Sequence, residues 1–448
     1  MTAAYRFDRL LAANTKKGWK AMDYNGKRLL IMGANPETAG LVKKANALGI
    51  YTVVTDYDPN AYAKRFASKA CDVDAMDTEA LVALAKEEKV DGVLLGVAEA
   101  LMPTYEKVCA ALGFPCYGNQ ELFALFVDKA NFKNVCRQHD VPVVEEYFLS
   151  DDFTDEELSR IPLPVVVKPV DACSSKGISI CKTYEELKTG IEKALSFSRS
   201  KRLIIEKYMT GAEVVIYYVF QDGVPSFVGM CDRYTNKEQE GVAQLPTSYV
   251  FPSRYQKKYS EEVDAKVKKM FQALRVQNGV MFIQSFIDNG EVRFYEPGYR
   301  LNGAQEHYII GAATGIDAKE LMLHFALTGR MSDEDISRKA APTLKGKYGC
   351  KLSPLVKEGT IAKIVGLDQI AEMKDVVSVN PSYDEGGVVS GYGTLKQIIC
   401  RFFIVSEDKV ALKNTLDEIQ KVFNVYNENG EAMLLREFDT EVIITDYE

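Results

Sequence analysis

Lysines and carboxylates stand beside short apolar runs at four places in the sequence. The first two are Lys129, in "DKANFK", and Lys168, in "VVVKP", which precedes the small-residue loop 171–177. The other two are "LIIEKYMTGAE" (203–213) and "FIQSFIDNGEVRFYEPGYRLNG" (282–303). Burying an unpaired charge is costly. A lysine directly after three valines therefore predicts an anionic partner, although an isolated lysine is more often a solvated surface residue.

The first two features suit the phosphates of a nucleoside triphosphate. The ammonium groups of Lys129 and Lys168 can neutralise phosphate oxygens as compact cations. The loop that follows Lys168 contains Ser174, Ser175 and Gly177. Small residues let a loop fold its backbone N–H groups over phosphates.

The third feature suits a nucleoside. The end of a strand at 206–209 can offer backbone N–H and C=O groups to the edge of an adenine, and Met209 can line the apolar face of the ring. Glu213 can accept hydrogen bonds from ribose hydroxyls. Taken alone, Glu206 is equally well explained as a surface residue at the end of a hairpin.

The fourth feature suits a metal ion and a transferring phosphoryl group. Gln284 and Glu296 lie on two predicted antiparallel strands joined by the turn Asn289-Gly290. Both side chains can offer oxygen, the ligand that Mg²⁺ prefers. Arg300 can stabilise charge on a phosphoryl group. For Glu296 alone, an ion pair with Arg300 in a turn is the simpler interpretation.

The surrounding pattern predicts how these residues are positioned. Strands at 28–33, 50–56 and 90–96 alternate with helices at 37–48, 78–88 and 101–112, which indicates a parallel α/β unit. From residue 164 the chain is rich in strands, and Asp222-Gly223 and Asn289-Gly290 predict hairpin turns. One helix is expected at 260–277. After about residue 330, short strands around a helix at 408–423 predict a third, α+β or barrel-like domain.

The composition narrows the class of protein. With 448 residues, 47% hydrophobic and 26% charged, the chain is expected to form two to four domains of a soluble protein. A net charge of −8 argues against a general binder of nucleic acid or anionic membranes. The absence of a long apolar run and of a hydrophobic leader favours a cytoplasmic location. The nine scattered cysteines indicate reduced thiols, and the three histidines argue against a histidine metal site.

The order of the four lysine and carboxylate features resembles the ATP-grasp superfamily. That superfamily includes biotin carboxylase, carbamoyl-phosphate synthetase, and the D-alanine–D-alanine and amino-acid ligases. The resemblance implies an ATP-grasp fold with a Rossmann-like parallel α/β domain before it and an α+β or barrel-like domain after it. The implied divisions are an N-terminal extension (1–26), the α/β domain (27–118), two subdomains that clamp ATP (119–330) and the C-terminal domain (331–448).

The resemblance also implies a role for each site residue, with ATP and Mg²⁺ or Mn²⁺ as the cofactors. The implied roles are phosphate binding for Lys129 and Lys168, adenine binding for Glu206, Lys207 and Met209, ribose binding for Glu213, and metal binding for Gln284 and Glu296. In such a site the loop residues Ser174, Ser175 and Gly177 would also face the phosphates, and Lys168 and Arg300 would take part in catalysis. Arg233, Arg300 and Asn302 are candidate contacts for the carboxylate substrate.

The sequence departs from the family pattern at the metal site. The pattern E-x-N-x-R reads Glu296-Pro297-Gly298-Tyr299-Arg300, so a glycine replaces the usual asparagine. One metal ligand is lost there, which leaves the number of bound ions open. The first ligand position is a glutamine, Gln284, as carbamoyl-phosphate synthetases also have.

The family chemistry implies a ligase that activates a small carboxylate as an acyl phosphate and transfers it to an amine. ADP and phosphate would be released. No nucleic-acid or membrane partner is expected, and homodimers are common in such families. Two alternatives stay open: a carboxylase or carbamoyl-phosphate synthetase-like enzyme that uses bicarbonate, favoured by Gln284, and an ATP-binding module without turnover, favoured by Gly298.

Overall fold

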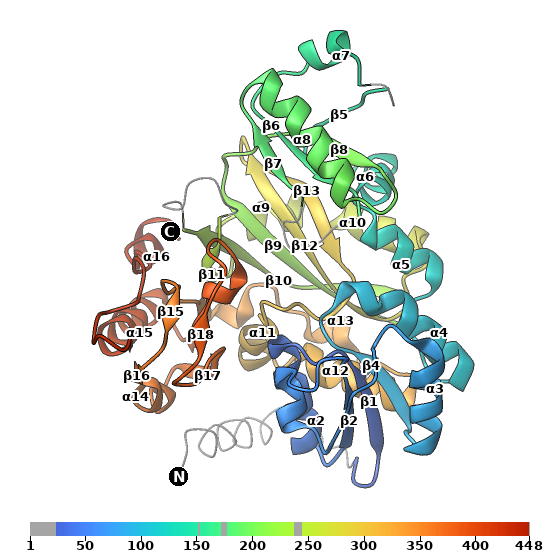
Figure 1. Ribbon diagram of the computed structural model, residues 1–448, viewed down its shortest axis with the longest axis vertical. Coiled ribbons are helices and arrows are strands. Elements are labelled where there is room, and N and C mark those ends of the chain that lie inside the picture. Colours follow the sequence, from blue (N-terminus) through green and yellow to red (C-terminus); the bar gives the residue numbers. More distant parts are fainter. Residues whose placement is uncertain (1–23, 151–152, 172–176, 237–243, 448) are drawn as a thin grey trace.

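The computed structural model describes residues 24–150, 153–171, 177–236 and 244–447, and Figure 1 shows how their elements are arranged. Two of the predicted phosphate-loop residues, Ser174 and Ser175, lie outside the described residues. So do residues 1–23 of the predicted N-terminal extension.

The first sheet of the described chain is parallel and has the strand order β3-β2-β1-β4. Its strands are β1 (Arg28–Met32), β2 (Tyr51–Thr55), β3 (Lys69–Cys71) and β4 (Gly92–Leu95), and the helices that follow them include α2 (Ala39–Ala47), α3 (Thr78–Glu87) and α4 (Met102–Leu112). The predicted alternation of strands and helices is confirmed here. Strand β3 was not predicted because its three residues, Lys-Ala-Cys, carry no apolar pattern.

A later helix, α12 (Ala318–Thr328), packs against this first sheet. The contact is close enough to require a glycine on β4. A Cβ atom at Gly92 would lie 2.1 Å from the carbonyl oxygen of Ala326. The chain therefore returns to its first sheet about 230 residues after leaving it, and α12 links that sheet to the central one.

The central sheet of the described residues has eight strands in the order β13-β12-β9-β10-β11-β14-β19-β17, and all its neighbours pair antiparallel. The strands are β9 (Glu213–Gln221), β10 (Val224–Thr235), β11 (Pro246–Phe251), β12 (Gly279–Asp288), β13 (Glu291–Gly298), β14 (Tyr348–Leu352), β17 (Val376–Pro381) and β19 (Cys400–Ser406). Strands from the predicted C-terminal domain thus continue the sheet of the predicted nucleotide-binding domain.

A smaller lobe stands above one end of the central sheet in Figure 1. Its sheet, among the residues described, has the order β5-β8-β6-β7. The strands are β5 (Glu146–Tyr147), β6 (Val165–Pro169), β7 (Ser179–Cys181) and β8 (Leu203–Lys207), and helix α8 (Tyr184–Phe197) covers them. The lobe has an apolar cluster of its own, distinct from the main core. It includes Val165, Val167, Leu187 and Ile205.

The remaining elements are η1 (Pro36–Thr38), η2 (Tyr62–Phe66), η3 (Glu99–Leu101), α5 (Gln120–Val127), α6 (Lys129–Gln138), α7 (Asp155–Ser159), α9 (Gln256–Glu262), α10 (Asp264–Ala273), α11 (His307–Thr314), α13 (Ile336–Lys339), η4 (Leu344–Gly346), β15 (Gly359–Thr360), β16 (Lys363–Val365), α14 (Leu367–Ala371), β18 (Val388–Val389), η5 (Leu395–Gln397), α15 (Lys409–Val422), β20 (Asn424–Tyr426) and α16 (Val442–Thr445).

Both predicted hairpin turns are present. Asp222 and Gly223 have φ angles of 50° and 81°, and Asn289 and Gly290 have 52° and 78°, as a two-residue turn between twisted strands requires. The prediction of a single helix at 260–277 is wrong. Two helices, α9 and α10, meet at Val263, whose φ and ψ of −120° and −40° interrupt the helix.

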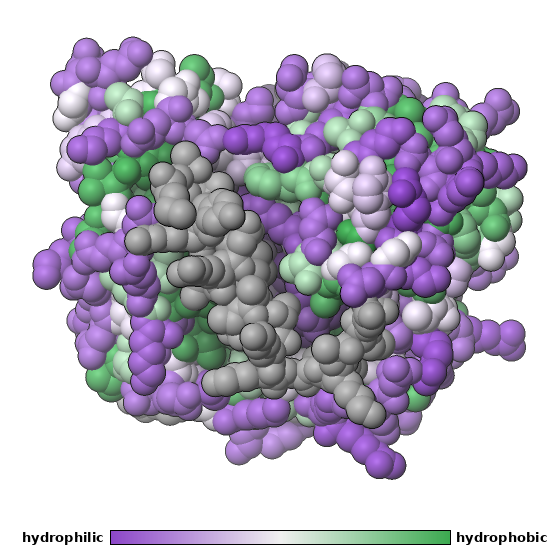
Figure 2. Space-filling model, turned by 90° about the horizontal axis from the view of Figure 1, so that it is seen from below, coloured by the Kyte–Doolittle hydropathy of each residue, from purple (hydrophilic) through white to green (hydrophobic). Residues whose placement is uncertain are grey.

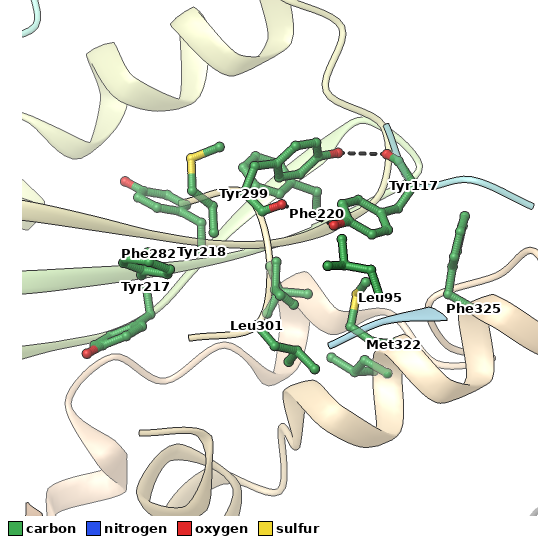
Figure 3. Packing of buried hydrophobic residues seen from close by; sticks show 14 of the residues in the cluster. Leu95, Tyr117, Tyr217, Tyr218, Phe220, Phe282, Tyr299, Leu301, Met322 and Phe325 are labelled. Atoms are coloured by element: carbon green, nitrogen blue, oxygen red, sulfur yellow. Dashed lines mark hydrogen bonds between the residues drawn. The ribbon is translucent and has the colours of Figure 1, made fainter. Parts of the chain in front are cut away.

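Among the described residues, no helix is both long enough and apolar enough to cross a membrane. The face seen from below, in Figure 2, carries mainly hydrophilic residues, with hydrophobic ones between them. The large apolar side chains are instead gathered in the interior, as the cluster in Figure 3 shows.

The close approach of β4 and α12 leads to a first prediction. We expect Gly92→Ala to lower the free energy of unfolding by about 1–3 kcal/mol, because the crowded atom belongs to the backbone and cannot rotate away. Urea denaturation followed by circular dichroism measures this change. Gly303→Ala is the matched control, since the nearest atom to its new Cβ lies 3.5 Å away on a side chain. Equal stability of the two variants would contradict the prediction.

Candidate functional site

The two lysines of the predicted phosphate site lie close together. Lys168 is on β6, and Lys129 is the first residue of α6. The backbone N–H of Lys129 donates to the carbonyl of Val170 at 3.3 Å, which holds the start of the helix against the end of the strand. The ammonium of Lys129 is 3.2 Å from a carboxylate oxygen of Glu296 on β13. Residues 167 positions apart in sequence therefore meet where the small lobe faces the central sheet.

Glu206 joins this group through two lysines. One carboxylate oxygen lies 2.7 Å from Nζ of Lys168, and the other contacts Nζ of Lys133, a fully buried side chain on α6. Lys133 is also 3.9 Å from Glu146 on β5. Lys133 is not among the site residues predicted from the sequence. The sequence feature that could have identified it is its position one helical turn after Lys129, on the same face of the helix.

The charges in this group shift one another's pKa values. Burial, with the charge of Lys129 acting in the same direction and Glu296 opposing it, lowers the pKa of Lys168 to about 8. Burial alone would raise the pKa of Glu296, but Lys129 and Lys168 hold it below its usual range. An additional anion beside Lys129 and Lys168 would favour their charged forms. The electrostatics thus suit phosphate.

At the predicted adenine end, the structure places Lys207 and Met209 where β8 ends. The N–H of Lys207 donates to the carbonyl of Glu145 at 3.0 Å, and the N–H of Tyr208 to that of Pro164 at 3.2 Å. The ammonium of Lys207 is 3.3 Å from Asp288. The side chain of Met209 is buried. Two of the backbone donors expected to face adenine are therefore bonded within the protein.

Glu213 and Arg233 stand opposite each other on β9 and β10 and form an ion pair. The hydroxyl of Tyr295 donates to the same carboxylate at 3.4 Å, and Nε of Arg233 donates to the hydroxyl of Tyr249 at 3.3 Å. The nearby Glu213 carboxylate raises the pKa of Arg233, against the opposing effect of burial. The predicted ribose residue and the predicted substrate residue thus lie side by side.

The two predicted metal ligands also lie side by side. Gln284 and Glu296 are directly paired across β12 and β13. Their oxygens fit a Mg²⁺ ion that takes its other ligands from phosphate and water. Within the described ranges, no group of three or more His, Cys, Asp or Glu side chains is placed to hold a metal ion without such help.

The structure explains why a glycine stands at position 298, where the family pattern has an asparagine. Gly298 is paired with Phe282 on the neighbouring strand, and a Cβ atom at 298 would lie 2.2 Å from the phenylalanine ring. The ring therefore occupies the space that an asparagine side chain would need. The guanidinium of Arg300 lies over the same ring, 5.2 Å from its centre.

Arg300 connects the β12–β13 hairpin to the segment that follows the first sheet's strand β4. Its Nη2 is 3.2 Å from a carboxylate oxygen of Glu99, in η3 directly after β4. Burial raises the pKa of Glu99 even though Arg300 opposes the shift. Glu99 was not predicted. Its signal is its place beyond the carboxyl end of a parallel strand, where α/β sheets bind ligands.

The remaining predicted residues fall at the edges of the site. Asn302 accepts a hydrogen bond from the N–H of Ala304 at 3.0 Å and, with Arg300, lines a small cavity. Gly177, at the end of the small-residue loop, has a φ of 75°, in the left-handed region that favours glycine.

Comparison with known proteins finds similarity to the same family over part of the chain. Residues 161–303 match the family model described as an ATP-grasp domain. The chain is 25% identical over 190 residues to the formate-dependent phosphoribosylglycinamide formyltransferase of Bacillus subtilis (strain 168), covering 42% of this chain and 49% of that protein. It is 34% identical over 155 residues to the D-alanine–D-alanine ligase of Corynebacterium jeikeium (strain K411), covering 34% and 40%. The chain thus spans about half the length or less of these curated relatives.

Among solved structures, the fold is similar to that of an L-amino acid ligase from Bacillus licheniformis. The TM-score is 0.73 at 18% sequence identity, covering 90% of this chain and all of that one. The predicted ATP-grasp fold, with a parallel α/β part and antiparallel sheets, is confirmed.

The pair Phe282–Gly298 leads to a second prediction. We expect Gly298→Asn to destabilise the protein by about 1–3 kcal/mol through overpacking. Phe282→Ala should lower the free energy of unfolding by less in the Gly298→Asn protein than in the wild type, because it removes the clash with the new side chain. Urea denaturation of the four proteins measures this coupling. Phe286→Ala, on the same strand, is the control. Its effect on the free energy of unfolding should be the same in the wild type and in the Gly298→Asn protein. A Phe282 effect that is equal in both backgrounds would contradict the prediction.

Proposed function

We propose that this chain, a member of the ATP-grasp superfamily, is an ATP-dependent ligase that joins a carboxylate to an amine. The observation that carries the proposal is the meeting of Lys129, Lys168 and Glu296 at one place between the small lobe and the central sheet. The cationic groups and the oxygen ligands that a triphosphate needs come from three separate segments. The D-alanine–D-alanine ligase and L-amino acid ligase relatives support this class of reaction.

In this proposal the two lysines bind the phosphate oxygens of ATP. Each is already held beside a carboxylate, so the arriving phosphate meets positioned groups. Gln284 and Glu296 would hold Mg²⁺, which would neutralise charge on the phosphates. Arg300, fixed between Glu99 and the ring of Phe282, neutralises negative charge on the transferring phosphoryl group. Lys207, Met209 and Glu213 contact the nucleoside.

The reaction that fits these groups has two steps. A carboxylate oxygen of the substrate attacks the γ-phosphorus of ATP, and the bond to the bridging oxygen breaks, giving an acyl phosphate and ADP. The amine then attacks the acyl carbon, phosphate leaves and the amine loses a proton, giving an amide. The protein's part is to position the reactants, neutralise charge and exclude water, which would hydrolyse the acyl phosphate.

The decisive experiment is a screen for ADP release with pairs of carboxylates and amines, and with bicarbonate as a separate arm. Release that requires both a carboxylate and an amine supports the proposal. Release with bicarbonate alone would instead support the carboxylase-like alternative. Binding of ATP without phosphate release in any arm would indicate a binding module, which the loss of a ligand at Gly298 favours.

The role of Lys168 leads to a third prediction. We expect Lys168→Met to weaken ATP binding by about ten-fold or more, because a charge-assisted hydrogen bond to phosphate is worth about 1.5–3 kcal/mol. Isothermal titration with ATP and Mg²⁺ measures the change. Lys182→Met, at an exposed position after β7, is the control and should bind as the wild type does. Wild-type affinity in the Lys168 variant would refute the phosphate assignment.

The role of Glu296 leads to a fourth prediction. Glu296→Gln should raise the Mg²⁺ concentration needed for half-maximal ADP release, because a carboxylate is a stronger ligand for Mg²⁺ than an amide. The same shift should appear in Mg²⁺-dependent nucleotide binding. Glu291→Gln is the control, since this exposed residue on the same strand pairs only with Arg293 among the described ion pairs. An unchanged Mg²⁺ dependence would argue against the metal assignment.

A further inference from the structure

A groove runs between the first α/β domain and the C-terminal part of the chain. It has a volume of about 610 Å³. One wall is formed by helix α2 and by η2, and the other by the segment from β16 to α14 and by the end of β17 with the residues that follow it. Figure 1 shows α2 and α14 at the same end of the molecule. Among the described residues that line the groove, none belongs to the predicted nucleotide or metal contacts, so it is a separate surface.

Both walls of the groove carry large apolar side chains that are only partly buried. These side chains are Tyr62, Phe66, Val365, Leu367 and Tyr383. An ion pair between Arg65 and Asp384, at 3.0 Å, joins the two walls, but more than half of each side chain is exposed. Such a surface pair contributes little to stability. Apolar side chains gathered in a groove between two parts of a chain commonly mark a binding surface.

The first described residues lie close to this groove. Asn25 packs against the end of α2, because a Cβ atom at Gly49 would lie 2.5 Å from its Oδ1. Lys43 is the last residue of α2 on the groove wall, six positions before Gly49, or about 9 Å along a helix. Trp19 is six positions before Asn25, and an extended chain of that length spans about 20 Å. Residues 1–23 can therefore reach the groove.

The sequence of residues 1–23 is complementary to the groove in charge and in apolar character. The segment contains five basic and two acidic residues, a net charge of +3, whereas the other 425 residues carry 50 Lys and Arg against 61 Asp and Glu, a net charge of −11. Opposite net charges favour contact between the two. The groove itself is lined by the carboxylates of Asp368, Asp384 and Glu385. The large apolar residues of the segment are Tyr5, Phe7, Leu10, Leu11, Trp19 and Met22.

We propose that residues 1–23 of the same chain bind in this groove, with the indole of Trp19 among its apolar side chains and a lysine of the segment beside Asp368. An indole ring buries a large apolar surface when it docks. Because the segment is attached beside the groove, its effective concentration there is high, an advantage that a free ligand or a second copy lacks. The bound segment contacts both walls and so ties the first domain to the C-terminal part. This inference does not depend on the proposed ligase function.

The test uses the fluorescence of the full chain, in which Trp19 is the only tryptophan. We expect acrylamide to quench Trp19 about three-fold or more weakly in the folded protein than in the urea-unfolded protein, because a docked ring is shielded from the quencher. Asp368→Lys should remove about half or more of this protection, since a like charge beside the lysines of the segment repels it. Glu79→Lys is the matched control and should behave as the wild type does, because Glu79 is also an exposed acidic residue in the first turn of a helix.

Cross-linking shows where the segment lies. A carbodiimide joins a lysine amine to a carboxylate that it touches, with loss of water to the reagent, and mass spectrometry identifies the linked peptides. We expect amide links within one chain from Lys16, Lys17 or Lys20 to Asp368 or Glu385.

Several outcomes would overturn this inference. One is that Trp19 is quenched as strongly in the folded protein as in the unfolded one. Another is that Asp368→Lys and Glu79→Lys protect Trp19 equally well, which would place the indole elsewhere. A third is that the cross-links join two chains and light scattering gives the mass of a dimer, which would place the segment on a second copy. Because the first comparison uses the wild-type protein alone, the test does not depend on the variants folding.

Discussion

The arrangement of the site depends on how the protein compensates lysines that it buries. Lys133 has no exposed surface, and both it and Lys168 are held by the single carboxylate of Glu206. Removing one member of a buried ion pair leaves an uncompensated charge, at a cost of about 3–5 kcal/mol. Helix α6, strand β6 and strand β8 must therefore keep their relative positions, and Lys129 at the start of α6 is fixed by the same requirement. The ion pairs of Glu206 with Lys133 and Lys168 thus hold the small lobe together and also place Lys129 and Lys168 next to the central sheet.

The parts of this arrangement that were predictable from the sequence are those with a local signal. Three valines before Lys168 indicate a buried strand, and Asn289-Gly290 specifies the hairpin that brings Gln284 beside Glu296. The contributions of Lys133 and Glu99 were missed because their roles arise only when distant segments meet. In the sequence, Lys133 is one more lysine on an amphipathic helix, and Glu99 follows a strand 201 residues before the Arg300 that it contacts. The pairing of β11 with β14 is similarly non-local and carries no motif.

The departure from the family pattern at residue 298 illustrates the same limit. From the sequence, Gly298 is only a missing ligand. In the structure it is one half of a pair, because the ring of Phe282 fills the space beside it and also lies under Arg300. Gly298 and Phe282 face each other across two strands. Where the family pattern has an asparagine side chain, this chain has the apolar ring of Phe282. An aromatic ring, with no oxygen to offer a metal ion, therefore occupies the place where the family pattern has a ligand.

The continuity of the central sheet connects the proposed nucleotide site to the C-terminal part of the chain. Neighbouring strands lie about 4.8 Å apart, so residues paired across successive strands form a row with that spacing. Glu213, Arg233, Tyr249 and Lys351 are paired in this way from β9 to β14. The row begins at the proposed ribose contact and ends at the buried Lys351, about three strand spacings away. A separate C-terminal domain joined by a flexible linker could not hold that distance. Because β14 is hydrogen-bonded directly to β11, the sheet itself sets the separation between Glu213 and Lys351.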